Sequence, residues 1–209
     1  MISVAEALAL VVDNNREFGI EKIDLLESTG RIIAQSVLAD RDFPAFDRVT
    51  MDGIAISFDT FEQGQKSFRI EGIQPAGVAK TTLLNKNNCI EVMTGAVLPA
   101  NTDVVIPYEQ CEINESLATV TTNKITHFQN IHIQGSDAKA GDVLVEKFEK
   151  ISPAIAGILA SVGLAKVEVL RLPAIAICST GEELVDIEQE PEPHQLRRSN
   201  IYALAAALI

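Results

Sequence analysis

Apolar residues recur along this chain with two different periods, and the changes of period divide it into stretches. At the start, apolar positions fall on one face of a helix over residues 3–16. Ser3 followed by Glu6 is a capping box, which favours a helix start at this point. The spacing predicts a second short helix over residues 23–29.

Short stretches with the character of β-strands begin after Asp40, separated by glycine, proline and asparagine turns. Their spacing predicts a β-rich subdomain. The expected strands cover residues 54–57, 67–73, 89–93, 103–107, 118–122 and 130–134.

The helical pattern returns at Ser152, an N-cap residue that is followed by Pro153 at the first helical position. Gly163 supplies the C-terminal stop of this helix. Because helical patterns flank the β-rich middle, we interpret the middle as an insertion.

The last stretch has the order of an α/β domain. Residues 165–170 alternate, residues 174–179 form a continuous apolar run, and a capped apolar helix is expected over 199–209. A buried strand followed by a helix opens a parallel α/β domain, and one such unit cannot bury its own surfaces. The final apolar pattern has no C-cap and no following strand, so we expect that the intact protein continues.

Together these patterns predict a multi-part α+β chain. Residues 1–44 and 140–170 form a helical or mixed N-terminal part, and residues 45–139 form the inserted β-rich subdomain. Residues 171–209 form the truncated start of an α/β domain.

The composition narrows the classes of partner. The 209 residues include 17 basic and 29 acidic side chains, a formal net charge of −12, with 47% hydrophobic residues. This hydrophobic content indicates a globular chain. The negative charge argues against nucleic acid or an anionic membrane as the partner, because either requires a basic surface. An anionic small molecule remains compatible with a locally positive or metal-containing site.

Compartment follows from three further features. The longest nearly apolar run, residues 154–165, is too short to cross a bilayer, and the N-terminus has no basic signal region. The three cysteines, at wide spacing, support neither a disulfide framework nor a zinc site, and we expect each to be a small buried residue. A cytoplasmic protein is the expectation.

The loop over residues 40–53 is the densest candidate for chemistry, with four carboxylates that include Asp52. One interpretation is a surface loop in which Asp52-Gly53 forms a turn. The other is a rigid, proline-containing loop that presents Asp52 to Mg²⁺ or to a substrate.

Two later turns leave the same choice open. Thr94-Gly95 is either an ordinary turn or a small nest of backbone N–H groups that binds an anion. Gly135-Ser136-Asp137, followed by a Gly-Asp pair, is hard to distinguish from a hairpin connection. The three histidines have no metal-ligand spacing and are interpreted as ordinary surface or strand residues.

Ser179-Thr180-Gly181-Glu182-Glu183 follows the expected buried strand directly. Ligands bind at the carboxyl ends of strands in open α/β sheets. The two glutamates could hold a divalent cation or accept hydrogen bonds from a heterocycle. Equally, they could only favour a helix N-terminus through its dipole.

Taken in order, these stretches resemble the molybdopterin molybdenumtransferase family, known as MoeA in bacteria and as the C-terminal part of gephyrin in animals. The resemblance covers essentially the whole chain, and five motifs in register are far more specific than any one of them. The motifs are DFPAFDRVTMDGIAIS, IEVMTGAVLPANTDVVIPYE, GSDAKAGDVL, the segment from ISPAIAG to STGEELV, and RSNIYAL.

The resemblance implies an activity and an assembly. Members of the family insert molybdate into adenylylated molybdopterin in a Mg²⁺-dependent reaction that releases AMP and forms molybdenum cofactor. They are elongated homodimers whose active sites lie between the β-rich domain of one subunit and the α/β domain of the other. The helical part would then serve dimerisation, residues 171–209 would begin the molybdopterin-binding domain, and molybdopterin adenylyltransferase would be a partner.

The resemblance also implies roles for single residues. Catalytic residues on the β-rich side would be Asp52, Thr94 and Asp137, of which Asp52 and Asp137 are candidate Mg²⁺ ligands. The residues that bind the pterin would be Thr180, Glu182 and Glu183. Because the family's glycine-rich pterin-binding turn lies beyond this sequence, the fragment alone is expected to be inactive.

The sequence departs from the family pattern at several positions. Arg48 and Val49 stand where Asn-Ser is frequent, and His132 and Gln134 stand where arginine is common; Ser136 and Arg198 also differ from the usual residues. Two other functions remain open. One is a non-catalytic, gephyrin-like scaffold or assembly module. The other is a sugar- or nucleotide-binding α/β protein that shares only the Thr-Gly-Glu-Glu turn, against which the upstream motifs count.

Overall fold

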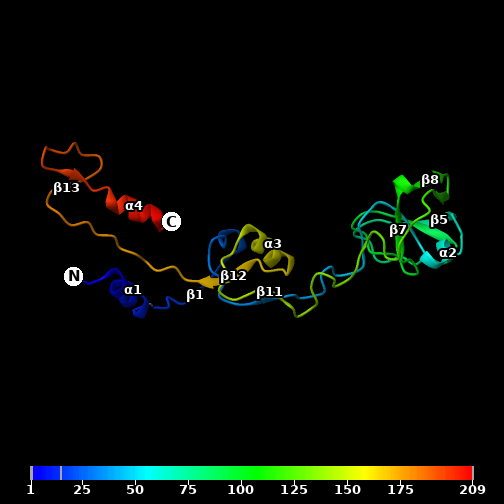
Figure 1. Ribbon diagram of the computed structural model, residues 1–209, viewed down its shortest axis with the longest axis horizontal. Coiled ribbons are helices and arrows are strands. Elements are labelled where there is room, and N and C mark those ends of the chain that lie inside the picture. The colour runs from blue at the N-terminus through cyan, green and yellow to red at the C-terminus, as the bar shows by residue number, and fades with distance from the viewer. Residues whose placement is uncertain (1, 15, 209) are drawn as a thin grey trace. The chain divides into compact units, whose positions relative to one another are not determined.

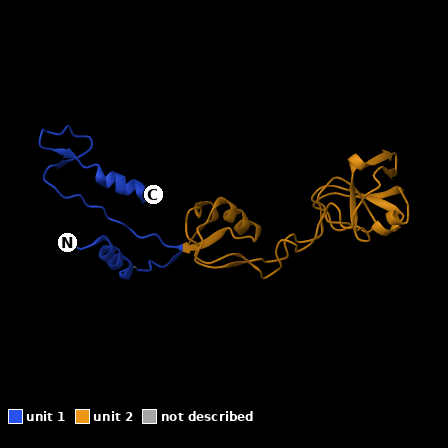
Figure 2. Cartoon of the chain, viewed as in Figure 1, with its two compact units in different colours: residues 1–21, 170–209 blue, residues 22–169 orange. Residues whose placement is uncertain are grey.

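The computed structural model describes residues 2–14 and 16–208, which form two compact units (Figure 2). Unit 1 combines the N-terminal segment up to residue 21 with the segment from residue 170 onward, and unit 2 comprises residues 22–169. Asn15 and Ile209, which fall in two expected helices, lie outside the described residues. No helix in the described ranges is long and apolar enough to cross a membrane.

A mixed six-stranded sheet is the largest element of unit 2 in the described residues, with the strand order β7-β4-β6-β5-β9-β8 (Figure 1). Its neighbours are antiparallel except β5 and β6, which run parallel with a register shift between Ile70 and Gly72. The strands are β4 (Gly53–Ile56), β5 (Ser67–Gln74), β6 (Asn88–Val92), β7 (Val104–Pro107), β8 (Cys111–Asn114) and β9 (Leu117–Val120).

The sequence predicted five of these six strands and missed β8, which is mostly exposed and carries little apolar alternation. The adjacent strands β7, at one edge of the sheet, and β4 are buried at every position, because both faces of the sheet are covered here. Ile54 and Ile56 pack in one apolar cluster together with Phe61 of the short helix α2 (Phe58–Glu62). Ala55, between them, packs in the cluster on the other face.

Gly53 is needed because β7 passes very close to it. A Cβ atom at this position would lie 1.9 Å from the backbone oxygen of Ile106. Gly53 therefore begins strand β4 and does not form the Asp-Gly turn of the surface-loop interpretation. The close backbone approach fixes the residue that immediately precedes it, Asp52.

A third apolar cluster of unit 2 joins segments that are far apart in the sequence. Helix α3 (Pro153–Ser161) is capped by Ser152, whose Oγ accepts from the Ile155 N–H at 3.2 Å, and Gly163 has a φ of 77°. The predicted cap and stop of this helix are confirmed. The cluster contains Ile33, Val37, Val145, Ile151, Leu159, Val167 and Val169.

Two small two-stranded sheets complete this region. Strand β2 (Val37–Leu38) pairs with β11 (Val143–Val145), and β1 (Ile20–Asp24) pairs with β12 (Lys166–Leu170). The short helix expected over residues 23–29 is wrong: these residues belong to β1 and to the 3-10 turn η1 (Leu25–Glu27). Burial alternates along β1, so that Ile23 reaches the cluster with the period of a strand. Residues 1–44 and 140–170, predicted to form a helical or mixed part, therefore contain strands β1, β2, β11 and β12.

Unit 1 contains the first and last helices. Helix α1 (Val4–Asp13) has the predicted capping box, with the Glu6 N–H donating to Ser3 Oγ at 3.2 Å and the Ser3 N–H to Glu6 Oε2 at 2.7 Å. Helix α4 (Asn200–Ala207) also forms, but Ser199 has helical backbone angles and makes no side-chain cap. The expected cap at Ser199 is therefore wrong.

The apolar run over residues 174–179 is not a strand in the described part of the chain. Ile175 is exposed there, because no neighbouring strand is placed to pair with the run. The pairing that does form in this segment is parallel, between β13 (Leu184–Val185) and β14 (Leu196–Arg197). Cys178 is exposed too, which contradicts the expectation that all three cysteines are buried.

The close approach at Gly53 generates a stability prediction. We expect Gly53→Ala to lower the free energy of unfolding of unit 2 by about 3 kcal/mol, because backbone would have to move to admit the Cβ. Gly72→Ala is the matched control, since a Cβ there meets nothing within 4 Å. The control should change stability by about 1 kcal/mol or less. Urea unfolding followed by circular dichroism measures both, and equal losses would contradict the steric explanation.

Candidate functional site

The short strand β3 (Arg48–Val49) is the place where three separate motifs meet. On one edge it pairs antiparallel with β10 (Ile131–His132). On the other edge the Val49 N–H donates to Ala96 O at 2.9 Å, and the Gly95 N–H donates to Val49 O at 2.8 Å. Strand β3, which leads to Asp52, therefore has the turn after β6 on one edge and the segment before Asp137 on the other.

Asp52 is held by the turn that follows β6. Its Oδ1 accepts hydrogen bonds from the backbone N–H and from the hydroxyl of Thr94, both at 2.6 Å. The Thr94 hydroxyl, and then the Thr94 N–H, lower the pKa of Asp52 below its ordinary value. Since the residue is exposed, Asp52 is an ionised and oriented carboxylate at the protein surface. Its Oδ2 accepts no hydrogen bond from any described residue.

The Thr94-Gly95 turn has no backbone N–H group left to bind a free anion. All three consecutive N–H groups are already used: Thr94 donates to Asp52, Gly95 to Val49 O, and Ala96 to Met93 O. The anion that this turn binds is the carboxylate of Asp52 itself. Sequence spacing showed the donors, but the acceptors come from segments far away in the chain.

Asp137 lies on the other side of β3. Its Oδ1 is 2.9 Å from His132 Nε2 and 3.4 Å from Ser136 Oγ, and its side chain is 59% exposed. The other imidazole nitrogen of His132, Nδ1, lies 3.1 Å from Arg48 Nη2. The interpretation of His132 as an ordinary strand residue overlooked this contact, which depends on the β3–β10 register.

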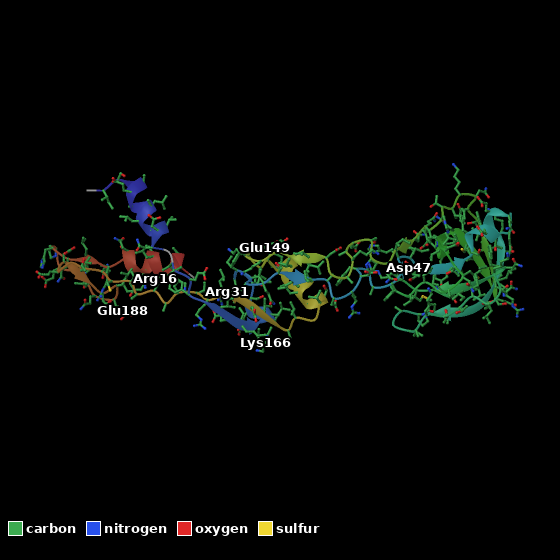
Figure 3. All side chains as sticks on the ribbon, turned by 90° about the horizontal axis from the view of Figure 1, so that it is seen from below. Arg16, Arg31, Asp47, Glu149, Lys166 and Glu188 are labelled. Atoms are coloured by element: carbon green, nitrogen blue, oxygen red, sulfur yellow. The ribbon has the colours of Figure 1, made fainter. Side chains whose placement is uncertain are left out.

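Other carboxylates of the same loop fasten the backbone. Asp42 accepts from the Ala140 N–H at 3.0 Å and from the Gln134 side-chain amide at 3.1 Å, and the Ala140 bond is the main cause of its lowered pKa. Asp47 accepts from the Gln134 N–H at 2.9 Å. Figure 3 labels Asp47 where the two segments that run side by side through the Phe43–Ala138 bridge reach the six-stranded sheet. These bonds hold the segment before Asp137 against the loop before Asp52.

Tyr108 is a neighbour of Asp52 that the sequence did not indicate. Its N–H donates to the backbone oxygen of Asp52 at 3.2 Å, and its hydroxyl donates to Glu91 Oε1 at 2.5 Å. Partial burial, followed by the hydrogen bond and charge of Glu91, raises the pKa of Tyr108. The phenol therefore stays protonated and acts as a donor beside the site.

The remaining predicted residues lie in unit 1. Thr180 lines a cavity of about 310 Å³ between the segment after residue 176 and helix α4, together with Arg197 and Arg198. Glu182 and Glu183 are exposed and do not line this cavity. The backbone oxygen of Glu183 accepts from the Leu196 N–H at 2.8 Å, which positions the β13–β14 pair.

No group of three His, Cys, Asp or Glu side chains in the described residues is placed to hold a metal ion by itself. Mg²⁺ does not require one, because it commonly takes one or two protein carboxylates and completes its shell with water and substrate phosphates. Asp52 and Asp137 have the chemistry for this, since each is exposed and has one carboxylate oxygen without a described hydrogen-bond donor.

Comparison with known proteins places the chain in a family. Residues 2–163 match the model of the MoeA N-terminal region, which covers domains I and II. The chain belongs to the MoeA family.

The MoeA relatives in other organisms are about twice as long. A molybdopterin molybdenumtransferase of Synechocystis is 42% identical over 209 residues, which are 100% of this chain and 54% of that protein. One of Staphylococcus epidermidis is 34% identical over 203 residues, 95% of this chain and 48% of that protein. The chain therefore spans about half the length of these MoeA relatives.

The fold agrees with this membership. A molybdopterin biosynthesis MoeA protein of Pyrococcus horikoshii superposes with a TM-score of 0.89 at 28% identity, over 100% of this chain and 56% of that structure. A second structure of MoeA from the same genus gives a TM-score of 0.81 at 30% identity, with 100% and 54% covered. The sheet-rich arrangement is thus that of the MoeA family.

The Asp52–Thr94 contact generates a prediction on acidity. We expect Thr94→Val to raise the pKa of Asp52 towards its ordinary value, because the hydroxyl is the largest cause of the depression. A carboxyl-carbon NMR titration measures this. Thr119→Val, which removes a hydroxyl 3.0 Å from Ser67 Oγ, is the control and should leave Asp52 unchanged.

The same depression fixes the sign of a pH effect. A carboxylate with a lowered pKa in the folded state adds stability above its unfolded-state pKa, and this stability is lost as the pH falls through the folded-state pKa. The stability difference between wild type and Thr94→Val should therefore be present near neutral pH and narrow in acid. A difference that grows in acid would contradict the assignment.

Proposed function

We propose that this chain is the N-terminal half of a molybdopterin molybdenumtransferase that acts in molybdenum cofactor biosynthesis. In this reaction molybdate is inserted into adenylylated molybdopterin and AMP is released. The observation that carries the proposal is the hydrogen bond of Thr94 to Asp52, next to strand β3, which pairs on one edge with the strand that leads to Asp137, in a chain of the MoeA family. The names of the Synechocystis and Staphylococcus relatives support the same activity.

The charges explain why a cation is part of the proposal. Both substrates are anions and the chain carries a net charge of −12, so two exposed carboxylates would repel a pyrophosphate. Asp52 and Asp137 would hold Mg²⁺, and a cation bound there would supply positive charge to neutralise phosphate oxygens. Thr94 keeps Asp52 ionised and fixed in direction, and Arg48 contributes a positive charge on the adjacent strand.

The residues of unit 1 are proposed to bind the pterin. Carboxylates such as Glu182 and Glu183 can accept hydrogen bonds from the ring N–H and amino groups of a pterin. A ligand that lacks these donors could not form the same hydrogen bonds, so the contacts give specificity. Thr180 opens onto the cavity that Arg197 and Arg198 also line. In this proposal residues 171–209 begin the molybdopterin-binding α/β domain, and the rest of that domain completes the pocket.

The proposal includes an assembly. Helix α1 has no buried residue, and it exposes Val4, Leu8 and Val11. Such an exposed apolar surface supports dimerisation through the helical or mixed part, residues 1–44 and 140–170. In this proposal the β-rich subdomain of residues 45–139 is an insertion in that part. We place the homodimer in the cytoplasm, where molybdopterin adenylyltransferase would supply its substrate.

The role of Asp52 is testable in the full-length protein. We expect Asp52→Ala to abolish restoration of molybdoenzyme activity in a host that lacks its own insertase, because the substrate-side carboxylate is removed. Asp59→Ala, which changes an exposed aspartate in α2, is the matched control and should restore activity like wild type. Restoration by Asp52→Ala would refute the catalytic role.

The fragment gives a second test. Purified residues 1–209 should form no molybdenum cofactor from adenylylated molybdopterin, molybdate and Mg²⁺, because the proposed pterin pocket is incomplete. Cofactor formation by the fragment would contradict the proposal that the rest of the α/β domain completes the pterin pocket. A full-length protein that folds and dimerises yet forms no cofactor would instead favour the gephyrin-like scaffold.

A further inference from the structure

His132 lies between a permanent cation and a proposed catalytic carboxylate. In the antiparallel register of β3 and β10, His132 is directly opposite Arg48. Its Nδ1 is 3.1 Å from Arg48 Nη2, and its Nε2 is 2.9 Å from Asp137 Oδ1. The three side chains thus form a continuous line across the two strands, and His132 is the only link between the other two among these contacts.

The chemistry of the two end groups determines the tautomer of the imidazole. An arginine guanidinium only donates, so the contact with Nδ1 requires a lone pair on that nitrogen. The proton of a neutral imidazole is then on Nε2, where it donates to the carboxylate of Asp137. Arg48 therefore orients the ring, and the ring presents a donor to Asp137.

Little else holds the Asp137 carboxylate. Its side chain is 59% exposed, and its other described contact, to Ser136 Oγ, is long at 3.4 Å. The backbone is fixed more firmly, since the Asp137 N–H donates to Phe43 O at 2.9 Å. Without His132 the backbone would stay in place while the carboxylate could rotate freely.

We propose that Arg48 and His132 are positioning residues for Asp137: Arg48 fixes the ring of His132, and the Nε2–H of His132 fixes the carboxylate that faces the substrate. The part of the proposal that concerns catalysis rests on the proposed function of Asp137. The part that concerns the tautomer does not, and it is measured separately.

The first experiment is spectroscopic and needs no activity. In residues 1–209, imidazole ¹⁵N shifts at neutral pH should show His132 as the Nε2–H tautomer in wild type. Arg48→Met should convert His132 to a mixture of tautomers, while the shifts of His194 stay unchanged. A mixture already present in wild type, or the same single tautomer in Arg48→Met, would overturn the role of Arg48.

The second experiment separates positioning from folding in the full-length protein. A glutamine side-chain N–H can replace the Nε2–H donor, whereas leucine cannot, so His132→Gln should keep most of the rate of cofactor formation. His132→Leu should lower kcat about tenfold or more, the effect of losing a hydrogen bond to a charged group, with little change in KM. His127→Leu, whose ring contacts Asp103 instead, is the control for loss of a surface histidine.

A double-substitution cycle decides between the interpretations. If His132 acts through the carboxylate, His132→Leu should cost little further rate once Asp137→Asn is present. An equal loss in both backgrounds, or equal rates for His132→Gln and His132→Leu, would show that His132 does not position Asp137. If wild type forms no cofactor although the tautomer is as expected, it is the proposed function that fails.

Discussion

The candidate site depends on the backbone pairing of the two-residue strand β3. One edge of β3 takes the turn that carries Thr94, and the other takes the strand that leads to Asp137. Hydrogen bonds from Gln134 to Asp42 and Asp47 reinforce this arrangement from the loop itself. The carboxylates are therefore oriented by a short ladder between three loops, while the buried strands β4 and β7 supply the rigid base from which Asp52 projects.

Local sequence patterns predicted the strands and helix caps whose signal lies within a few neighbouring residues. The alternation or continuity of apolar residues found β4 to β7 and β9, and the caps at Ser3 and Ser152 were recognised from single residues. The stretch over residues 23–29 was misassigned as a helix. Its first residues belong to β1, and the pairing of β1 with β12 imposes a period of two. The strand predicted over residues 174–179 did not form, because a strand requires a neighbouring strand to pair with as well as apolar residues.

The sequence proposed members of the candidate site but did not show the contacts of their side chains. Resemblance to the family pointed to Asp52, Thr94 and Asp137, but the partners of their side chains are set by pairings between distant segments, such as Arg48 with His132, which are 84 residues apart. Gly53 illustrates the difference: in the sequence an Asp-Gly pair favours a turn, whereas in the structure the glycine is required by the backbone of β7. The net charge of −12 argued only against broad classes of partner and did not locate a site.

The central claim is that the three segments joined by β3 form one binding site in the full-length protein. Hydrogen–deuterium exchange tests it directly, with adenylylated molybdopterin and Mg²⁺ added to the full-length protein. The account predicts that peptides containing Asp52, Thr94 and Asp137 gain protection together and at the same ligand concentration, while those of β8 and β9 do not change. Protection of one of the three segments without the others would contradict it.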